Sequence, residues 1–162
     1  MTPELLHELS EYPTFPESAK VLIEVIGREA AARLVAAWGG QEWPVPIRPG
    51  GSNAAGARRY DSLCAVIGES AAQRLVVFWS GCKINIPNLK EVRTAHVRCL
   101  IVQDFDTLIM QKGYSSIDAI FELGIRYGVT GKTVEDALKK KAFWKKSERD
   151  IKSEFLYKKA KP

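Results

Sequence analysis

The sequence predicts a mainly α-helical protein with a small β ribbon, and three observations support this fold class. Two segments repeat each other at an offset of 41 residues, each with the pattern of two helices and a strand. Residues 120–141 have the spacing of two helices joined by a tight turn. The last 24 residues are strongly basic. We therefore expect a duplicated helix-helix-strand domain over residues 1–88. A helix-turn-helix domain with a basic C-terminal helix is expected over residues 89–162.

The repeat aligns "LIEVIGREAAARLVAAWGGQEWPVP", from Leu22, with "LCAVIGESAAQRLVVFWSGCKINIP", from Leu63, without a gap. Each copy predicts a short apolar helix that ends at Gly27 or Gly68, because glycine takes the left-handed conformation that closes many helices. A second helix is expected from about residue 29 to 38 and from about residue 70 to 79, with apolar residues at helical spacing. One unit cannot bury its own apolar face, so the two copies are expected to pack together.

Each copy then continues into an extended segment. "KINIP" alternates apolar and polar residues, which predicts a strand with one buried face. The matching "EWPVPI" contains Pro44 and Pro46, which cannot donate ladder hydrogen bonds, so it is an edge strand at best. The two strands can pair within one chain or between chains. We favour a homodimer, because the prolines weaken the internal partner while the other strand keeps its donors: Lys83, Ile84, Asn85 and Ile86. The segment "RPGGSNAAGARR" between the copies is expected to be a surface linker.

The second half of the chain begins with a long amphipathic helix, expected from about Leu89 to Lys112. Ser115 or Ser116 can cap the helix that follows. In that helix Gly124 is small enough for a close crossing, and Gly128 supplies the tight turn. Thr130 can cap the last helix, whose inward residues are Val134, Ala137 and Leu138. An ordinary helical hairpin with a glycine turn is the alternative.

The charge of the protein is unevenly distributed. The chain has a net charge of +5, but residues 139–162 carry ten Lys or Arg and three Asp or Glu, a net +7, which leaves −2 for residues 1–138. A basic segment on a near-neutral body favours an anionic partner, most simply nucleic acid. Lys141, Lys145 and Lys146 are expected to contact phosphates. The alternative is a solvated helix that only improves solubility.

The last predicted helix also carries acids. With Val134 and Ala137 facing inward, Lys132, Asp136 and Lys139 fall on its outer face, and Glu135 and Lys140 flank them. Glu135 is expected to pair with Lys139, and Asp136 with Lys140, at favourable four-residue spacing. Asp136 has two interpretations: one partner of an exposed ion pair, or an acceptor for a cytosine amino group in the major groove.

Two quoted segments, "SGCKINIP" and "RYGVTGKTVEDALKKK", resemble the Mor/C family of phage middle and late transcription activators. The resemblance covers about residues 63–141 and rests on residues in two groups. Those matching the family strand are Gly81, Ile84, Ile86 and Pro87, and those matching its helix-turn-helix motif are Arg126, Tyr127, Gly128, Val129, Thr130, Thr133 and Val134. The resemblance implies a dimerisation region, a trihelical DNA-binding domain and activation of transcription. This chain departs from the family by carrying two dimerisation-like units. It is also longer between Phe105 and the motif, by roughly three helical turns.

The sequence therefore predicts a sequence-specific DNA-binding transcriptional regulator of phage or prophage origin. The residues expected to bind DNA are Arg126, Thr130, Lys132, Thr133, Asp136, Lys139 and Lys140. The expected partners are double-stranded DNA, a second copy of the chain and, as a further candidate, host RNA polymerase. The alternative is a protein-interaction module on the same scaffold, such as a phage inhibitor of a host factor. The duplication and the acidic helix favour this alternative, whereas the basic tail opposes it.

Other classes of function find little support in the sequence. It shows no Ser/His/Asp set, metal-binding cluster or paired carboxylates in a recognisable site, so we expect no catalysis, no cofactor and no metal. Three isolated cysteines indicate reduced thiols. Neither a membrane span nor a signal peptide is recognisable, so a cytoplasmic location without membrane contact is expected.

Overall fold

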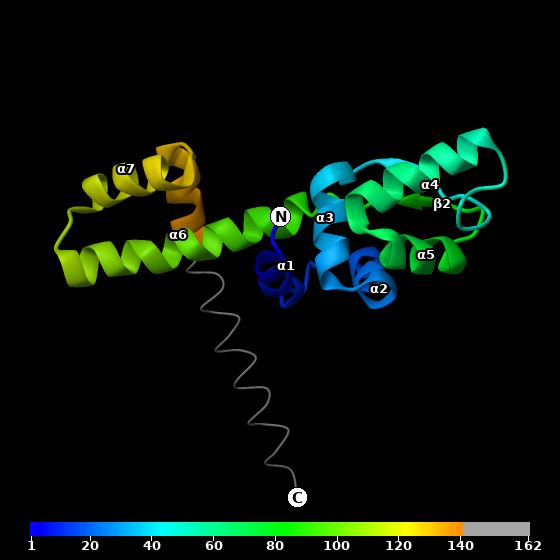
Figure 1. Cartoon of the computed structure of the whole chain (residues 1–162). Coiled ribbons are helices and arrows are strands. Elements are labelled where there is room, and N and C mark those ends of the chain that lie inside the picture. The colour runs from blue at the N-terminus through cyan, green and yellow to red at the C-terminus, as the bar shows by residue number, and fades with distance from the viewer. Residues whose placement is uncertain (141–162) are drawn as a thin grey trace, which may run out of the picture. The chain divides into compact units, whose positions relative to one another are not determined.

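The structure, a computed structural model, describes residues 1–140 (Figure 1). It is mainly helical, with one antiparallel sheet of two strands. The chain divides into two compact units, Met1–Arg93 and the residues from Thr94 onward. The expected phosphate contacts Lys141, Lys145 and Lys146 lie outside the described residues. Within residues 1–140, no helix combines the length and apolar composition needed to cross a bilayer.

The first unit contains five helices and both strands, and it begins with a helix that the sequence analysis did not predict. This helix, α1 (Pro3–Ser10), is capped by Thr2, whose hydroxyl accepts from the N–H of Leu5 at 3.2 Å. Eight residues are too few for a stable isolated helix, so α1 depends on burial of Leu6 and Leu9 and on packing against α3. The other elements are α2 (Glu17–Ile26), α3 (Arg28–Trp38), β1 (Glu42–Pro44), α4 (Ala54–Ile67), α5 (Glu69–Phe78) and β2 (Lys83–Asn85).

The two glycines that join the helices of each copy have almost the same backbone conformation. Gly27 has φ 85° and ψ 157°, and Gly68 has φ 85° and ψ 156°. The predicted helix ends are therefore present, but the predicted left-handed conformation is wrong. This combination of positive φ and extended ψ is open essentially to glycine alone. It turns the chain sharply, so that α3 and α5 begin at the very next residues, Arg28 and Glu69.

The segment predicted as a surface linker is only partly a linker. Helix α4 begins at Ala54, inside that segment, and is therefore longer than its counterpart α2. Asn53 provides the physical reason, because its side-chain oxygen accepts from the N–H of Gly56 at 2.8 Å and caps the helix. The alanines that follow favour helix over loop. Composition alone indicated a surface linker, whereas one capping residue fixes where the helix starts.

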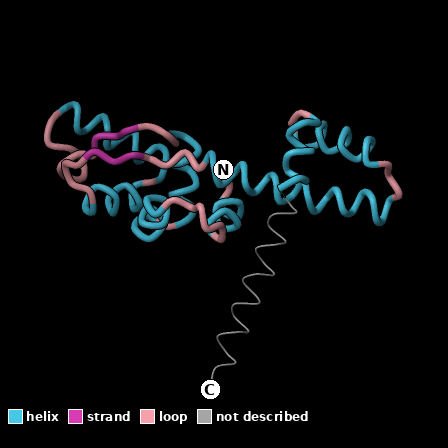
Figure 2. Tube along the Cα trace, turned by 180° about the vertical axis from the view of Figure 1, so that it is seen from behind, coloured by secondary structure: helices cyan, strands magenta, loops and turns pink. Residues whose placement is uncertain are grey.

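The strands β1 and β2 pair antiparallel within one chain (Figure 2), so the prediction that the prolines spoil the internal partner is wrong. The N–H of Val45 donates to the carbonyl of Cys82 at 2.8 Å, and the N–H of Ile86 donates to the carbonyl of Gln41 at 2.9 Å. Hydrogen-bonded and non-hydrogen-bonded pairs alternate along such a ladder. Pro44, opposite Lys83, therefore occupies a position at which no N–H donor is needed.

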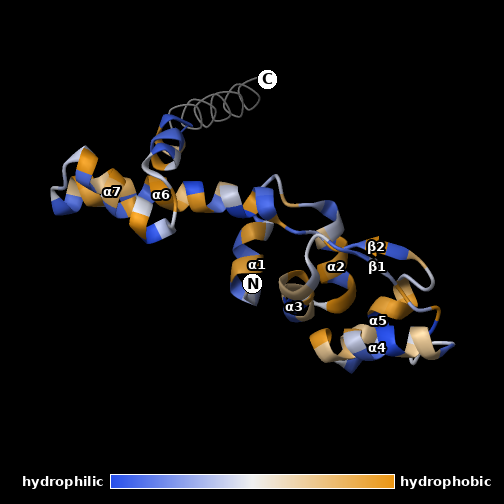
Figure 3. Ribbon diagram, turned by 90° about the horizontal axis from the view of Figure 1, so that it is seen from above, coloured by the Kyte–Doolittle hydropathy of each residue, from blue (hydrophilic) through white to orange (hydrophobic). Residues whose placement is uncertain are grey.

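The core of the first unit is built from helices of both copies. Helix α2 packs against α5 and α3 against α4, so each copy packs its helices on those of the other. Each helix carries apolar residues beside polar ones (Figure 3), as amphipathic helices with one buried face do. The most deeply buried side chains include Ile26, Leu34, Leu63, Ile67 and Leu75.

The second unit contains most of α6 (Lys90–Lys112), then α7 (Ser116–Tyr127) and a further helix from residue 131 to the end of the described residues at 140. We call the last element the 131–140 helix. Helix α7 runs back along α6, and the 131–140 helix crosses α6 (Figure 1). The three helices enclose a separate core of Ile101, Leu108, Ala119, Leu123, Val134 and Ala137.

Candidate nucleic-acid interface

The turn between α7 and the 131–140 helix depends on two glycines. Gly128 ends α7 in the left-handed conformation, with φ 62° and ψ 36°. The N–H of Val129 then donates to the carbonyl of Gly124 at 2.9 Å, which closes the turn over the end of α7. A Cβ atom at Gly124 would lie 3.1 Å from the carbonyl oxygen of Val129. The backbone of the turn therefore approaches α7 closely at this point.

The start of the 131–140 helix is fixed by two threonines. The hydroxyl of Thr130 accepts from the N–H of Thr133 at 3.3 Å, and the two hydroxyls lie 2.9 Å apart. Thr130 is thus the predicted N-cap. Val134 and Ala137 are buried and Leu138 is half-buried, which defines the inward face of the helix. Because these residues face inward, the charged residues at the other positions of the helix face outward.

The outward face of the 131–140 helix carries five exposed charged residues: Lys132, Glu135, Asp136, Lys139 and Lys140. The Lys139 ammonium lies 4.0 Å from the Glu135 carboxylate and 3.9 Å from that of Asp136. The expected Glu135–Lys139 pair is therefore present. Asp136 faces Lys139 rather than Lys140, which corrects the other predicted pair. Exposed ion pairs at this distance are weak, so an approaching ligand can displace them at little cost.

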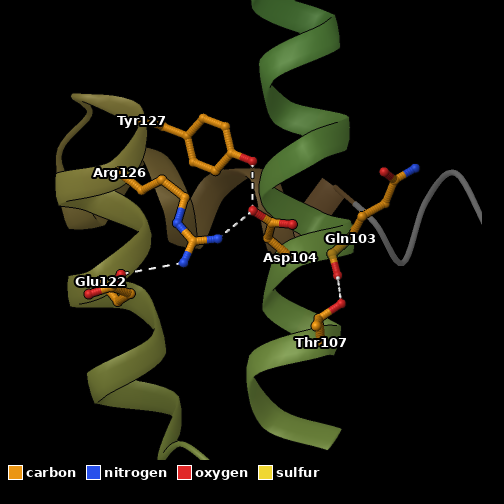
Figure 4. Close-up of polar contacts among 6 residues, drawn as sticks. All are labelled: Gln103, Asp104, Thr107, Glu122, Arg126 and Tyr127. Carbon is orange, nitrogen blue, oxygen red and sulfur yellow. Dashed lines mark hydrogen bonds and ion pairs between the residues drawn. The ribbon is translucent and has the colours of Figure 1, made fainter. Parts of the chain in front are cut away.

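Asp104 of α6 accepts hydrogen bonds from two residues at the end of α7 (Figure 4). The guanidinium of Arg126 donates to the Asp104 carboxylate at 2.9 Å, and the hydroxyl of Tyr127 donates to the same oxygen at 2.8 Å. A second nitrogen of Arg126 lies 3.4 Å from the Glu122 carboxylate. These contacts tie the last turn of α7 to the middle of α6. They hold the adjoining Gly128 turn in place on the second unit.

This cluster shifts two pKa values. Desolvation by burial, and secondly the hydrogen bond to Asp104, raise the pKa of Tyr127 from 10.0 to about 12. The hydrogen bond to Asp104, followed by that to Glu122, raises the pKa of Arg126 above its ordinary value. Tyr127 therefore stays a neutral donor, and Arg126 a cation, throughout the physiological range.

The structure divides the seven residues predicted to bind DNA into two groups. Arg126 faces two carboxylates, and the hydroxyl of Thr130 caps the helix and contacts the hydroxyl of Thr133. On the exposed face of the 131–140 helix lie the other four: Lys132, Asp136, Lys139 and Lys140. Sequence reasoning missed Asp104. The signal available was an acid within the apolar stripe of α6, three residues after the buried Ile101.

The strand residues predicted to mediate dimerisation lie in the first unit, paired with β1. The Lys83 ammonium lies 2.8 Å from the Glu42 carboxylate of the neighbouring strand. Ile84 is opposite Trp43, Asn85 is opposite Glu42, and Ile86 is buried in the core. These residues have their partners within the same chain.

Comparisons with known proteins found no matching family model, no matching curated protein and no matching solved structure. The resemblance to the Mor/C family therefore remains a prediction from the residues quoted above. Among residues 1–140, no group of three or more His, Cys, Asp or Glu side chains is arranged to hold a metal ion.

Proposed function

We propose that the second unit is a helix-turn-helix domain that binds duplex DNA, with the 131–140 helix as its recognition helix. One observation carries the proposal: a glycine turn packed closely against α7 presents a capped helix whose outward face is charged and whose inward face is buried. A recognition helix has the same requirements, because its outer side chains must reach base edges while its inner ones anchor it. Lys132, Lys139 and Lys140 would contact phosphates, and Arg126 would position the turn through Asp104.

The wider role follows from the resemblance. A sequence-specific transcriptional regulator of phage or prophage origin is the function that best joins this domain to the basic C-terminal segment. Regulation would further require a contact with host RNA polymerase or competition with it.

A titration of labelled duplex DNA at low salt tests the proposal. The variant Lys132→Ala/Lys139→Ala/Lys140→Ala should bind at least about tenfold more weakly than the unmodified protein, with a salt dependence reduced by up to about three counterions. Lys20→Ala/Arg58→Ala/Arg59→Ala is the matched control, because it removes three exposed positive charges from the first unit. Equal weakening in both variants would show that net charge alone drives binding.

Asp136 needs a separate test, because it has two interpretations. If its carboxylate accepts from a cytosine amino group, Asp136→Ala should relax base preference at one position of the binding site. If it only repels phosphate, the variant should bind every duplex more tightly, as Glu135→Ala should. Comparing both variants on a panel of single-base changes separates these outcomes.

Protein binding is the second candidate function, and the surface of α7 favours it. Ile117, Phe121 and Ile125 follow one another at four-residue spacing on one side of the helix, and they are 80%, 70% and 66% exposed. Such a row is unusual on a surface that meets only water. A protein-interaction module on a reused helix-turn-helix scaffold, such as a phage inhibitor of a host factor, would use it. Failure to bind any duplex at low salt would favour this candidate.

A further inference from the structure

We propose that the first unit is a two-fold dimer fused into one chain, so that the protein is a monomer carrying a single recognition helix. In a homodimer with two-fold symmetry, residue i of one subunit contacts residue j of the other, and j contacts i. The two copies of the repeat, related by 41 positions, meet this condition within one polypeptide.

The strand register is the first line of support. Trp43 lies opposite Ile84, and these two residues are equivalents in the repeat. Glu42 lies opposite Asn85, the equivalent of Pro44, while Pro44 lies opposite Lys83, the equivalent of Glu42. A residue that pairs with its own equivalent, flanked by exchanged neighbours, marks the position of a two-fold axis.

The hydrogen bonds beside the strands obey the same exchange. The N–H of Val45 donates to the carbonyl of Cys82 at 2.8 Å. The N–H of Ile86, the equivalent of Val45, donates to the carbonyl of Gln41, the equivalent of Cys82, at 2.9 Å. The ladder is thus the same when read from either copy.

A reciprocal pair of arginines provides an independent line of support, away from the strands. Arg33, in the first copy, donates to the carbonyl of Ile67 at 3.2 Å, at the end of α4. Arg74, its equivalent, donates to the carbonyl of Ile26 at 3.0 Å, at the end of α2. Each cation meets the unsatisfied carbonyls and the negative dipole end of a helix from the other copy.

The surface between these arginines shows the same relation. A cavity of about 420 Å³ there is lined by Ile26, Gly27 and Arg33 and by their equivalents Ile67, Gly68 and Arg74. The helix packing follows the same relation. Helix α2 packs against α5, and their equivalents α4 and α3 pack against each other. The helices, the strands and the side-chain contacts therefore agree on one pseudo-two-fold relation.

The symmetry ends where the chain leaves the strands. After Pro87 the chain continues into α6 and the second unit, whereas after the equivalent Pro46 it continues into α4. One two-fold unit therefore carries one recognition helix. A symmetric dimer reads two related half-sites, so the fused form should occupy one site without two-fold symmetry, in a 1:1 complex. This last step rests on the proposed DNA binding, whereas the fusion does not.

Disulfide trapping in the full-length chain tests the fusion directly. Glu42 and Asn85 are exposed and opposite each other at a non-hydrogen-bonded position, where Cα atoms lie about 4.5 Å apart, within disulfide range. Glu42→Cys/Asn85→Cys, with Cys82→Ser and Cys99→Ser to remove the exposed native thiols, should oxidise to a monomer with an internal cross-link. Glu42→Cys alone, in the same background, is the control and should not cross-link.

Covalent dimers of the double-cysteine variant would overturn the fusion, because they would show that the strands pair between chains. A failure to form either product would contradict the register itself. Light scattering of the unmodified protein at micromolar concentration should give a mass near 18.1 kDa, and about twice that mass would also overturn the proposal.

The two proposals fail in distinguishable ways. A monomer with an internal cross-link that binds no duplex would retain the fusion and reject DNA binding. A protein that binds duplex as a 36 kDa species (about twice the chain mass) would retain DNA binding and reject the fusion. The mass of the DNA complex, measured by sedimentation, then decides whether a single chain occupies each site.

Discussion

Asp104 links α6 to the end of α7, because one of its oxygens accepts from both Tyr127 and Arg126. Tyr127→Phe removes only the hydroxyl and should lower the free energy of unfolding by about 1 kcal/mol, the typical net value of such a hydrogen bond. Urea denaturation followed by circular dichroism measures this loss. Tyr114→Phe is the matched control, because Tyr114 is 41% exposed, and it should change stability little.

The contact between Tyr127 and Asp104 also predicts that the stability of the fold depends on pH in the alkaline range. The folded pKa of Tyr127, about 12, lies above its ordinary value of 10.0. Its contribution to stability is therefore complete below pH 10 and is lost as pH rises from 10 towards 12. Absorbance at 295 nm should show a late tyrosine titration that disappears in Tyr127→Phe. Loss of the late step in Tyr60→Phe instead would assign it to the buried Tyr60, whose pKa burial also raises.

Residues that act locally could be predicted from the sequence, and residues that act across the fold could not. The caps at Ser115 and Thr130 follow from side chains that bond to N–H groups three residues later. Arg126 was predicted from its match to the family motif, but its partner Asp104, 22 positions away in the sequence, was not. Nothing in the local pattern around either residue indicates that they meet.

At the scale of elements, the turn after α7 gives the clearest prediction. Gly128 has φ 62° with open space where a Cβ would lie, so a side chain there costs backbone strain but no clash. Gly128→Ala should therefore lower the free energy of unfolding by about 1 kcal/mol. Gly128→Asn should cost less, because asparagine tolerates the left-handed conformation. Thermal unfolding compares the two, and an equal loss in both would point to a contact rather than to strain.

The helices were more predictable than the strand pairing. Apolar residues at helical spacing located α3, α5 and α6 within a few positions, while Gly27 marked the end of α2, and Ser115 or Ser116 and Gly128 marked the ends of α7. Whether β1 can pair with β2 depends instead on whether the Pro44 nitrogen faces the partner strand. The strand register sets that direction. Helix α1 escaped prediction because its stability comes from Leu6 and Leu9 packing against the rest of the unit.

At the scale of the whole molecule, two separate cores predict two unfolding transitions. Leu34 lies fully buried in the first core and Leu123 in the second. Leu34→Ala and Leu123→Ala should each cost about 2–5 kcal/mol, and each should lower only the transition of its own unit. Differential scanning calorimetry of the full chain measures both. A single transition that moves equally in both variants would show that the units unfold together.

The fusion of two copies also changes what a mutation does. In a protein built from two identical chains every substitution appears twice, once on each side of the axis, so a gain on one face is tied to a cost on the other. In this chain a substitution in one copy leaves the other copy unchanged. Where the first copy has Ala36 and Ala37, the second has Val77 and Phe78, which are 69% and 60% exposed. A substitution can therefore change one side alone, and the face around Phe78 carries larger exposed apolar side chains than its counterpart.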